Sequence, residues 1–292
     1  MRILILGGSG MLGHKLVQRL SPRFDVFATV RDNGKSLLLR GIVQPSQLLS
    51  KVDVCDDSAL IKAIETAQPN AVINAVGIVK QHPTADDITN TLTVNSILPN
   101  KLSQLGQKYG YRLITMSTDC VFSGDKGNYS EADITDATDL YGHSKILGEV
   151  SEGNCLTIRS SIIGRELDMS HGVIEWFLSN RGSRVNGFAN AIYSGFPTIV
   201  FADIIGDLLL DHPDLQGLYH ISSEPIDKFR LLCLANVVFD ARVTIDRDEA
   251  FKIDRSLDSS KFRAATGFAP QPWEEMVERM ATDPTPYDDW RK

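Results

Sequence analysis

The sequence predicts an α/β fold with a doubly wound parallel sheet, followed by a smaller C-terminal lobe of mixed α and β structure. Three observations lead to this expectation. Through residues 1–160, short apolar runs alternate with longer helical patterns, which is typical of a parallel sheet with helices on both faces. The runs are continuously apolar, as strands buried on both faces are. Beyond about residue 161 the expected elements become shorter, and glycine, proline and aromatic residues are more frequent.

The expected elements follow one another in regular order. Strands are expected at 3–6, 24–30, 52–54, 71–74, 113–116 and 156–158, with helices at 11–20, 58–68, 91–109 and 139–152. Residues 31–50 give no clear pattern. Later elements are a helix at 201–210, a strand at 217–222 and helices at 227–239 and 273–280, before a polar tail of about a dozen residues. We therefore expect one domain at 1–160, to which residues of about 198–212 return, and a lobe at 161–292.

Composition and charge exclude several classes of protein. The 292 residues are 42% hydrophobic and 23% charged, as in an ordinary globular protein. The net charge of -7 argues against nucleic acid or an anionic membrane as a partner. No apolar run is long enough to span a membrane, and the N-terminus lacks a signal-peptide pattern. The four cysteines are scattered, which favours reduced thiols in the cytoplasm over a disulfide framework or a metal site.

A glycine-rich loop follows the first expected strand and opens the first expected helix. The three glycines Gly7, Gly10 and Gly13 flank Met11 and Leu12 in the pattern G-x-x-G-x-x-G. One glycine would make the tight turn, another would let the backbone approach a pyrophosphate, and the third would let helix and strand pack closely. The helix N-terminus would face the phosphates with free N–H groups. The loop therefore predicts a dinucleotide site in a Rossmann-type sheet.

The second expected strand ends at a residue that bears on the choice of cofactor. An acidic residue about 20 positions after the loop would accept hydrogen bonds from the ribose hydroxyls of NAD. Here Arg31 ends the strand and is well placed to pair with the 2′-phosphate of NADP. The alternative is that Arg31 is solvated and neighbouring Asp32 binds NAD. The charge argument favours NADP(H) over NAD(H).

A tyrosine and a lysine four residues apart suggest chemistry near the middle of the chain. Tyr141 and Lys145 would lie on one face of a helix. The ammonium would lower the pKa of Tyr141 and make the phenol a usable proton donor. Ser117 and Thr118 close the fifth expected strand, so they reach the same edge of the sheet. An exposed pair without function is the alternative that spacing alone leaves open.

These motifs resemble the extended short-chain dehydrogenase/reductase superfamily, and nearly the whole chain is similar to its dTDP-4-dehydrorhamnose reductase family. The shared segments are Ser117-Thr-Asp-Cys-Val-Phe122, Glu131-Ala-Asp133, Tyr141-Gly-His-Ser-Lys145 with Gly148-Glu149, Ile158-Arg-Ser-Ser161, Gly195-Phe-Pro-Thr198, Ala202-Asp203, Leu257-Asp-Ser-Ser-Lys261 and Trp273-Glu274. The resemblance implies a catalytic triad of Thr118, Tyr141 and Lys145. Thr118 would hold a substrate carbonyl, Tyr141 would donate a proton, and Lys145 would bind the nicotinamide ribose.

The resemblance also implies further residues along the cofactor. They are Asp53 and Val54 near the adenine, the segment Ala75-Val76-Gly77, a helix asparagine at Asn95, and Ser117. Asp53 as the cap of the helix at 58–68, and Asn95 as an ordinary helix residue, are alternatives.

Departures from the family pattern fall around the expected substrate pocket, which the lobe at 161–292 would help to form. Cys120 stands where the family often has tyrosine, and Ile162 where it often has tryptophan. Lys80 lies in a segment that replaces the usual V-D-x-x-E. Together with Thr118 and Trp176, these three residues are the candidates for contact with substrate.

The function that the resemblance implies is an NADPH-dependent reduction of a 4-keto nucleotide sugar, by a possible homodimer. The three departures around the pocket suggest a sugar other than dTDP-4-dehydrorhamnose. Two alternatives stay open. One is a nucleotide-sugar epimerase or dehydratase, although dehydratases carry Asp-Glu after the threonine and Cys120 replaces that glutamate. The other is a non-catalytic regulatory subunit that binds NADP.

Overall fold

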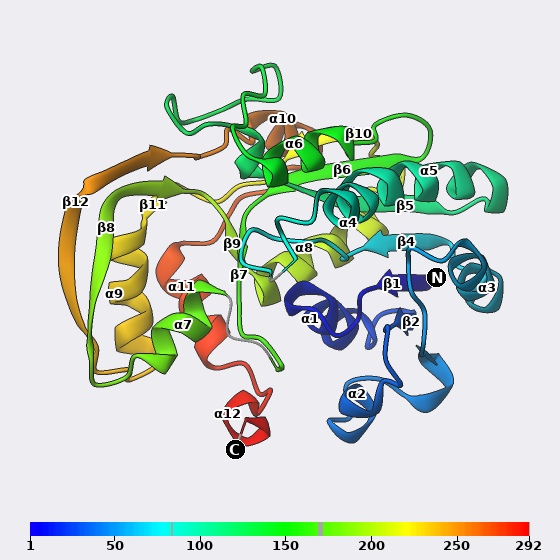
Figure 1. The fold of residues 1–292 in the computed structure, drawn as a ribbon, viewed down its shortest axis with the longest axis horizontal. Helices are drawn as coiled ribbons and strands as arrows, with labels where there is room; N and C mark the ends of the chain where they lie inside the picture. Colours follow the sequence, from blue (N-terminus) through cyan, green and yellow to red (C-terminus); the bar gives the residue numbers. More distant parts are fainter. Residues whose placement is uncertain (83, 169–171, 292) are drawn as a thin grey trace. The chain divides into compact units, whose positions relative to one another are not determined.

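The computed structural model describes residues 1–82, 84–168 and 172–291 (Figure 1). The chain forms two compact units. The first, which we call the sheet unit, comprises Met1–Ser117, Asp139–Ile158 and Ala202–Leu218. The second unit comprises Thr118–Thr138, Arg159–Phe201 and the residues from Tyr219 onward. The units interleave along the chain: Thr118–Thr138 fall in the second unit, whereas Asp139–Ile158 and Ala202–Leu218 belong to the sheet unit.

A seven-stranded sheet with the order β10-β6-β5-β4-β1-β2-β3 forms the centre of the fold (Figure 1). The pairs β1–β2, β2–β3, β1–β4 and β4–β5 are parallel. The order runs outward in opposite directions from β1 and β4, as in doubly wound dinucleotide-binding sheets. The strands are β1 (Arg2–Leu6), β2 (Asp25–Thr29), β3 (Leu48–Leu49), β4 (Ala71–Asn74), β5 (Arg112–Thr118), β6 (Cys155–Ser160) and β10 (Gly217–His220).

Helices cover both faces of this sheet. Successive strand residues point to opposite sides, so the apolar side chains on both faces are buried against helices. Leu4 and Leu6 of β1 pack with α3 (Asp57–Ala67) and α5 (Leu98–Tyr109) in one buried cluster. The alternate residues Ile3 and Ile5 are equally buried on the other side. The sheet unit also contains α1 (Met11–Leu20), α2 (Lys35–Leu39), α4 (Ile88–Leu92), α6 (Leu140–Leu147) and most of α8 (Thr198–Asp211).

Ion pairs join α1 and the turn that follows it to α8. Arg19 Nε lies 2.8 Å from Asp203, and one turn later an Arg23 amine lies 2.8 Å from Asp207. A Cβ at Gly206 would lie 2.7 Å from the Arg23 guanidinium, so the small residue makes room for that side chain. These contacts hold α8 within the sheet unit.

The expected third strand at 52–54 is wrong. The strand that pairs with β2 is β3 at Leu48–Leu49, after a 3-10 turn at Pro45–Gln47. Val52 and Val54 are buried, and Val52 N–H still donates to the Val30 carbonyl at 2.9 Å, but they form no strand. Their apolar alternation reflects burial rather than pairing in the sheet.

The helix expected at 91–109 is interrupted. α4 passes into a π turn at Thr93–Ile97 and then into α5. The second residue of α5 is a proline. A π turn inserts an extra residue and often marks a functional position. Here it contains Asn95, one of the residues expected near the cofactor.

The second unit contains a three-stranded sheet, a two-stranded sheet and five helices among its described residues. β8 (Arg184–Tyr193) lies between β11 (Ile226–Asp227) and β12 (Thr244–Asp254), and β7 (Ile162–Ile163) pairs with β9 (Phe196–Pro197). The helices are α7 (Val173–Ser179), α9 (Lys228–Val238), α10 (Ser260–Thr266), α11 (Trp273–Ala281) and α12 (Tyr287–Trp290). The expected polar tail is therefore wrong in part, because α12 is a helix with buried Tyr287.

Two kinds of feature are absent from the part of the chain that the structure describes. None of its helices is both long enough and apolar enough to cross a membrane. Nor does any group of histidine, cysteine, aspartate or glutamate side chains in residues 1–82, 84–168 and 172–291 form a set that could hold a metal ion.

Candidate active site

The glycine loop closes tightly between β1 and α1. Gly7 has a φ of +81°, in the left-handed region that favours glycine. A Cβ at Gly13 would lie 2.0 Å from the Gly7 carbonyl oxygen, so the helix and the loop meet through their backbones. Gly10 begins α1 without a side-chain hydrogen bond, and Met11 and Leu12 form its first turn. The N–H groups of this turn can therefore serve a phosphate, and the loop fits a dinucleotide.

The segment Ala75-Val76-Gly77 borders this loop. A Cβ at Gly7 would lie 2.9 Å from Cγ2 of Val76, and Ala75 N–H donates to the Leu6 carbonyl at 3.2 Å. The order of strands reverses between β1 and β4, where doubly wound sheets bind their ligands. Their contact with a cofactor stays a prediction.

Arg31 and Asp32 differ in what they contact. Both are exposed after β2. The Asp32 carboxylate accepts a hydrogen bond from Gly34 N–H at 2.8 Å, so it shapes the following turn. Arg31 makes no hydrogen bond or ion pair with the residues that the structure describes. Its guanidinium is therefore available to an anionic ligand at this edge of the sheet.

Asp53 and Val54 lie in the turn before α3. The Asp53 carboxylate accepts from Cys55 N–H at 2.9 Å. The cap of α3 is Asp56, whose side chain accepts from the N–H groups of the first turn. The alternative role of Asp53 as the helix cap is therefore wrong. Val54 is 5% exposed and packs in the core, so only its backbone can face a ligand.

Tyr141 and Lys145 lie one turn apart on α6, as the spacing predicted. The Asp139 side chain caps the helix by accepting from Gly142 N–H at 2.8 Å. Lys145 is buried, and its ammonium donates to the Met116 carbonyl of β5 at 2.5 Å. Burial lowers the pKa of Lys145 to about 8, against an opposing effect of Glu149. An ammonium carries three donors, and Met116 uses one of them.

Lys80 lies beside Tyr141 rather than in a free loop. Its ammonium forms an ion pair with Asp139 and stands 5.8 Å from the centre of the Tyr141 ring. This places one of the substrate candidates next to the expected proton donor. No sequence pattern predicts this contact, because Lys80 and Asp139 are far apart in the chain.

Asn95 holds backbone together within the sheet unit. Its Oδ1 accepts from Ile78 N–H at 2.9 Å, and its Nδ2 donates to the Ile78 carbonyl at 2.8 Å and to Ser144 Oγ at 3.0 Å. Both amide hydrogens are therefore used. Asn95 fixes the loop after β4 against α6, and its expected place near the cofactor stays a prediction.

Ser117 and Thr118 end β5 and make different contacts. Ser117 Oγ donates to the Glu149 carboxylate at 2.6 Å. Thr118 belongs to the second unit, where its Oγ1 donates to Asp119 Oδ1 at 3.1 Å and accepts from Cys120 N–H at 3.1 Å. Burial raises the pKa of Asp119, whose side chain is almost fully enclosed.

The remaining substrate candidates lie in the second unit. An Arg255 amine stands 3.6 Å from Cys120 Sγ, while Arg255 Nε donates to the Phe122 carbonyl at 2.8 Å. Ile162 is half-buried in β7, and Trp176 is 41% exposed on α7. Sequence reasoning missed Arg255, because it lies beyond the expected helix at 227–239 in a segment without an expected element.

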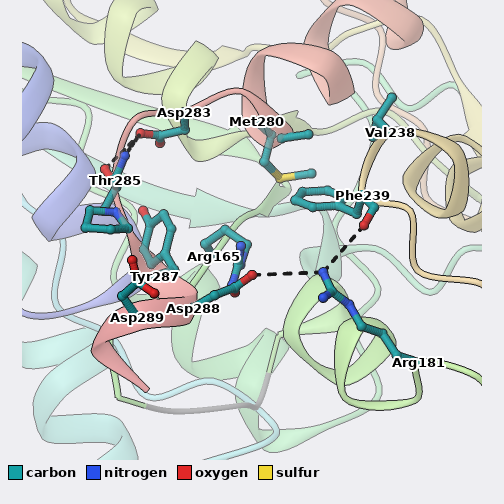
Figure 2. A pocket seen from close by; sticks show the side chains of 12 residues that line it. Arg165, Arg181, Val238, Phe239, Met280, Asp283, Thr285, Tyr287, Asp288 and Asp289 are labelled. Atoms are coloured by element: carbon teal, nitrogen blue, oxygen red, sulfur yellow. Dashed lines mark hydrogen bonds and ion pairs between the residues drawn. The ribbon is translucent and has the colours of Figure 1, made fainter. Parts of the chain in front are cut away.

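Figure 2 shows a pocket of about 290 Å³ in the second unit, formed around the C-terminal segment. None of the predicted site residues lines it. The Arg181 amine donates to the Phe239 carbonyl at 3.5 Å and lies 4.0 Å from Asp288 (Figure 2). Asp288 also receives a 2.5 Å hydrogen bond from Arg165. Aspartates and arginines thus compensate one another here, and we assign the pocket no role in the chemistry.

The strand order, the glycine loop and the Tyr141–Lys145 pair together define an extended short-chain dehydrogenase/reductase, a class of NAD(P)-dependent oxidoreductases. Within that class, the chain belongs to the family of the RmlD substrate binding domain, whose model matches residues 1–285.

The relatives include one named as a reductase and one named as a subunit of a different enzyme. The dTDP-4-dehydrorhamnose reductase of Aggregatibacter actinomycetemcomitans is 24% identical over an alignment of 305 positions, gaps included. The alignment covers 96% of this chain and 98% of the reductase. The methionine adenosyltransferase 2 subunit beta of Bos taurus is 26% identical over 250 residues, which cover 80% of this chain and 70% of that subunit.

Two solved structures share the fold. The dTDP-4-dehydrorhamnose reductase of Bacillus anthracis, in complex with NADP, superposes with a TM-score of 0.78 at 19% identity and covers 96% of this chain and 98% of its own. A Bordetella bronchiseptica enzyme in complex with NAD and UDP gives a TM-score of 0.76 at 20% identity, covering 99% of this chain and 93% of its own.

Proposed function

We propose that this protein reduces the keto group of a 4-keto nucleotide sugar with NADPH. The observation that carries the proposal is the placement of Tyr141 and Lys145 on one face of α6, with Lys145 fixed to the end of β5. The reductase among the relatives, matched over nearly its full length, supports the substrate class. The departures at Cys120 and Ile162 favour a sugar other than the one in that relative's name.

The chain's own residues account for the proton transfer. A nicotinamide cofactor held by the glycine loop would supply the hydride. Tyr141 donates its proton to the substrate oxygen, so that no bare alkoxide forms. The Lys145 ammonium stabilises the phenolate left on Tyr141, and its remaining donors can hold ribose hydroxyls.

Thr118 donates a hydrogen bond to the substrate oxygen, and the protonation state of Asp119 determines whether the Thr118 hydroxyl hydrogen is available for it. While Asp119 is ionised, the Thr118 hydroxyl hydrogen points to its carboxylate. Burial raises the pKa of Asp119, so its acid form is reached at a higher pH than in an exposed aspartate. A protonated Asp119 would donate to Thr118 and release the Thr118 hydrogen for a substrate oxygen.

NADP is the cofactor that the charges favour. Arg31 is exposed and has no hydrogen bond or ion pair among the described residues, whereas Asp32 is used by the Gly34 turn. A guanidinium suits a 2′-phosphate, and a carboxylate would repel it.

We expect Arg31→Ala to raise the Kd for NADPH about 10- to 100-fold, the loss of one hydrogen-bonded charge pair. The Kd for NADH should stay within about twofold. Isothermal titration of both nucleotides measures the two constants, and Lys62→Ala, which removes an exposed cation from α3, is the matched control. Equal loss of NADPH and NADH affinity would mean that Arg31 does not read the 2′-phosphate.

The function is tested by following NADPH consumption by absorbance over a panel of 4-keto nucleotide sugars. We expect turnover with at least one sugar that differs from dTDP-4-dehydrorhamnose. A second candidate function is a regulatory subunit that binds NADP, and the relative named as a subunit of methionine adenosyltransferase favours it. Tight NADPH binding without consumption across the panel would support that candidate instead.

A further inference from the structure

Glu149 lies just beyond α6 and is not part of the expected triad. It follows Lys145 by four residues, after the helix ends at Leu147. Helical turns continue over this end, since Glu149 N–H donates to the Ile146 carbonyl at 3.2 Å. Gly148 fixes the direction of the chain here, because a Cβ at this position would lie 1.9 Å from the Asn95 carbonyl oxygen. The chain after α6 therefore packs closely against the π turn that contains Asn95.

Consecutive residues at the end of β5 hold Lys145 and Glu149. The Met116 carbonyl accepts from the Lys145 ammonium at 2.5 Å, and the Ser117 hydroxyl donates to the Glu149 carboxylate at 2.6 Å. The cation and the anion are thus both attached to one short stretch of strand. Lys145 is buried and Glu149 is half-buried.

Glu149 is the charged side chain that acts on the Lys145 ammonium among the residues that the structure describes. The Met116 carbonyl, which accepts from Lys145, and the Ser117 hydroxyl, which donates to Glu149, carry no net charge. Tyr141 lies on the same face of α6. Burial lowers the pKa of Lys145, and the negative charge of Glu149 raises it, so that the two effects oppose each other.

The margin for this balance is small. With the pKa of Lys145 already lowered to about 8, most of the lysine is charged at neutral pH. A further fall of about one pH unit would leave roughly half of it neutral at pH 7. A neutral amine could not stabilise a phenolate on Tyr141.

We propose that Glu149 is a positioning residue that keeps the Lys145 ammonium charged, with Ser117 holding the Glu149 carboxylate in place. The effect on catalysis rests on the proposed function, but the effect on Lys145 does not. If Glu149 only fastened β5 to the chain after α6, removing its charge would leave the titration of Lys145 unchanged.

The direct test is the titration of Lys145 by NMR in the full-length protein labelled with ¹³C at lysine Cε. The resonance of Lys145 is assigned by its loss in Lys145→Arg. Glu149→Gln keeps the shape of the side chain and removes its charge, and we expect the pKa of Lys145 to fall by about one unit. Glu149→Asp should leave it within about half a unit, and Glu152→Gln, which removes an exposed carboxylate three residues later, should not move it.

An unchanged pKa of Lys145 in Glu149→Gln would overturn the proposal. Should that variant not fold, Ser117→Ala tests the same link, because it removes the hydroxyl that holds Glu149 and leaves the charge. A smaller fall in the pKa of Lys145 is then expected, and no change would contradict the proposal.

Activity gives a second measurement when a substrate is in hand. Lys145 acts in its charged form, so activity is lost as pH rises through its pKa. The alkaline limb of kcat/KM should therefore move to lower pH in Glu149→Gln, with about a fivefold loss at pH 8 and little change at pH 6. A loss that is equal at both pH values, with an unchanged Lys145 titration, would indicate a structural role and overturn the proposal. An absence of turnover in the wild type contradicts the proposed function alone.

Discussion

Tyr141→Phe should abolish measurable reduction of the sugar while leaving the fold and the binding of NADPH intact. The variant removes one hydroxyl from the first turn of α6 and keeps the ring beside Lys80. General acid catalysis typically contributes 10²- to 10⁴-fold, so we expect kcat to fall by about that factor. The loss should appear in kcat and kcat/KM alike, because the proton is transferred only in the transition state.

The measurement is steady-state NADPH oxidation with the best substrate of the panel, together with the Kd for NADPH. Tyr109→Phe is the matched control, because it removes a phenolic hydroxyl from the last residue of α5, where that hydroxyl contacts Glu65 at 3.0 Å. The control should keep wild-type turnover. Full activity in Tyr141→Phe would exclude Tyr141 as the proton donor.

Glu175→Gln should strongly destabilise the second unit. Glu175 is 2% exposed, and its carboxylate lies 2.6 Å from Arg165 Nε and 2.6 Å from an Arg291 amine. It also accepts from Glu166 N–H at 3.0 Å. Without this charge, the buried Arg165 keeps only the more exposed Asp288 as an anionic partner among the described residues. Breaking a buried pair in this way costs about 3–5 kcal/mol of unfolding free energy.

Urea unfolding followed by tryptophan fluorescence measures this free energy for the full-length protein. Glu274→Gln, an exposed glutamate in the first turn of α11, is the control and should change stability by less than about 0.5 kcal/mol. A change below about 1 kcal/mol in Glu175→Gln would mean that the network around Arg165 does not hold α12 in place.

The order of strands and helices in the sheet unit could be predicted from the sequence, because continuous apolar runs that alternate with helical patterns are typical of a parallel sheet covered by helices. The third strand could not. Val52 and Val54 have the apolar character of a strand, but Leu48 and Leu49 lie next to β2 after a turn at Pro45–Gln47. Which of two apolar pairs joins the sheet depends on the path of the loop, and local composition does not encode that path.

The candidate site shows a similar division. Gly7, Gly13, Tyr141 and Lys145 follow from spacing, since each pattern lies within one turn or one loop. The contacts of Lys80 with Asp139 and of Ser117 with Glu149 depend on how α6 lies against β5. Such long-range pairs carry no signal in a single sequence. The same holds for Arg165, Glu175 and Arg291, which meet only once the C-terminal helix is in place.

The most direct test of the proposed reduction is the transfer of deuterium from labelled NADPH. The full-length protein is incubated with each 4-keto nucleotide sugar and NADPH that carries deuterium at its transferable position, and the product sugar is examined by mass spectrometry and NMR. We predict one deuterium at the former keto carbon of at least one sugar, and none with Tyr141→Phe. Binding of NADPH without deuterium in any sugar would contradict the proposed reductase and favour the regulatory subunit.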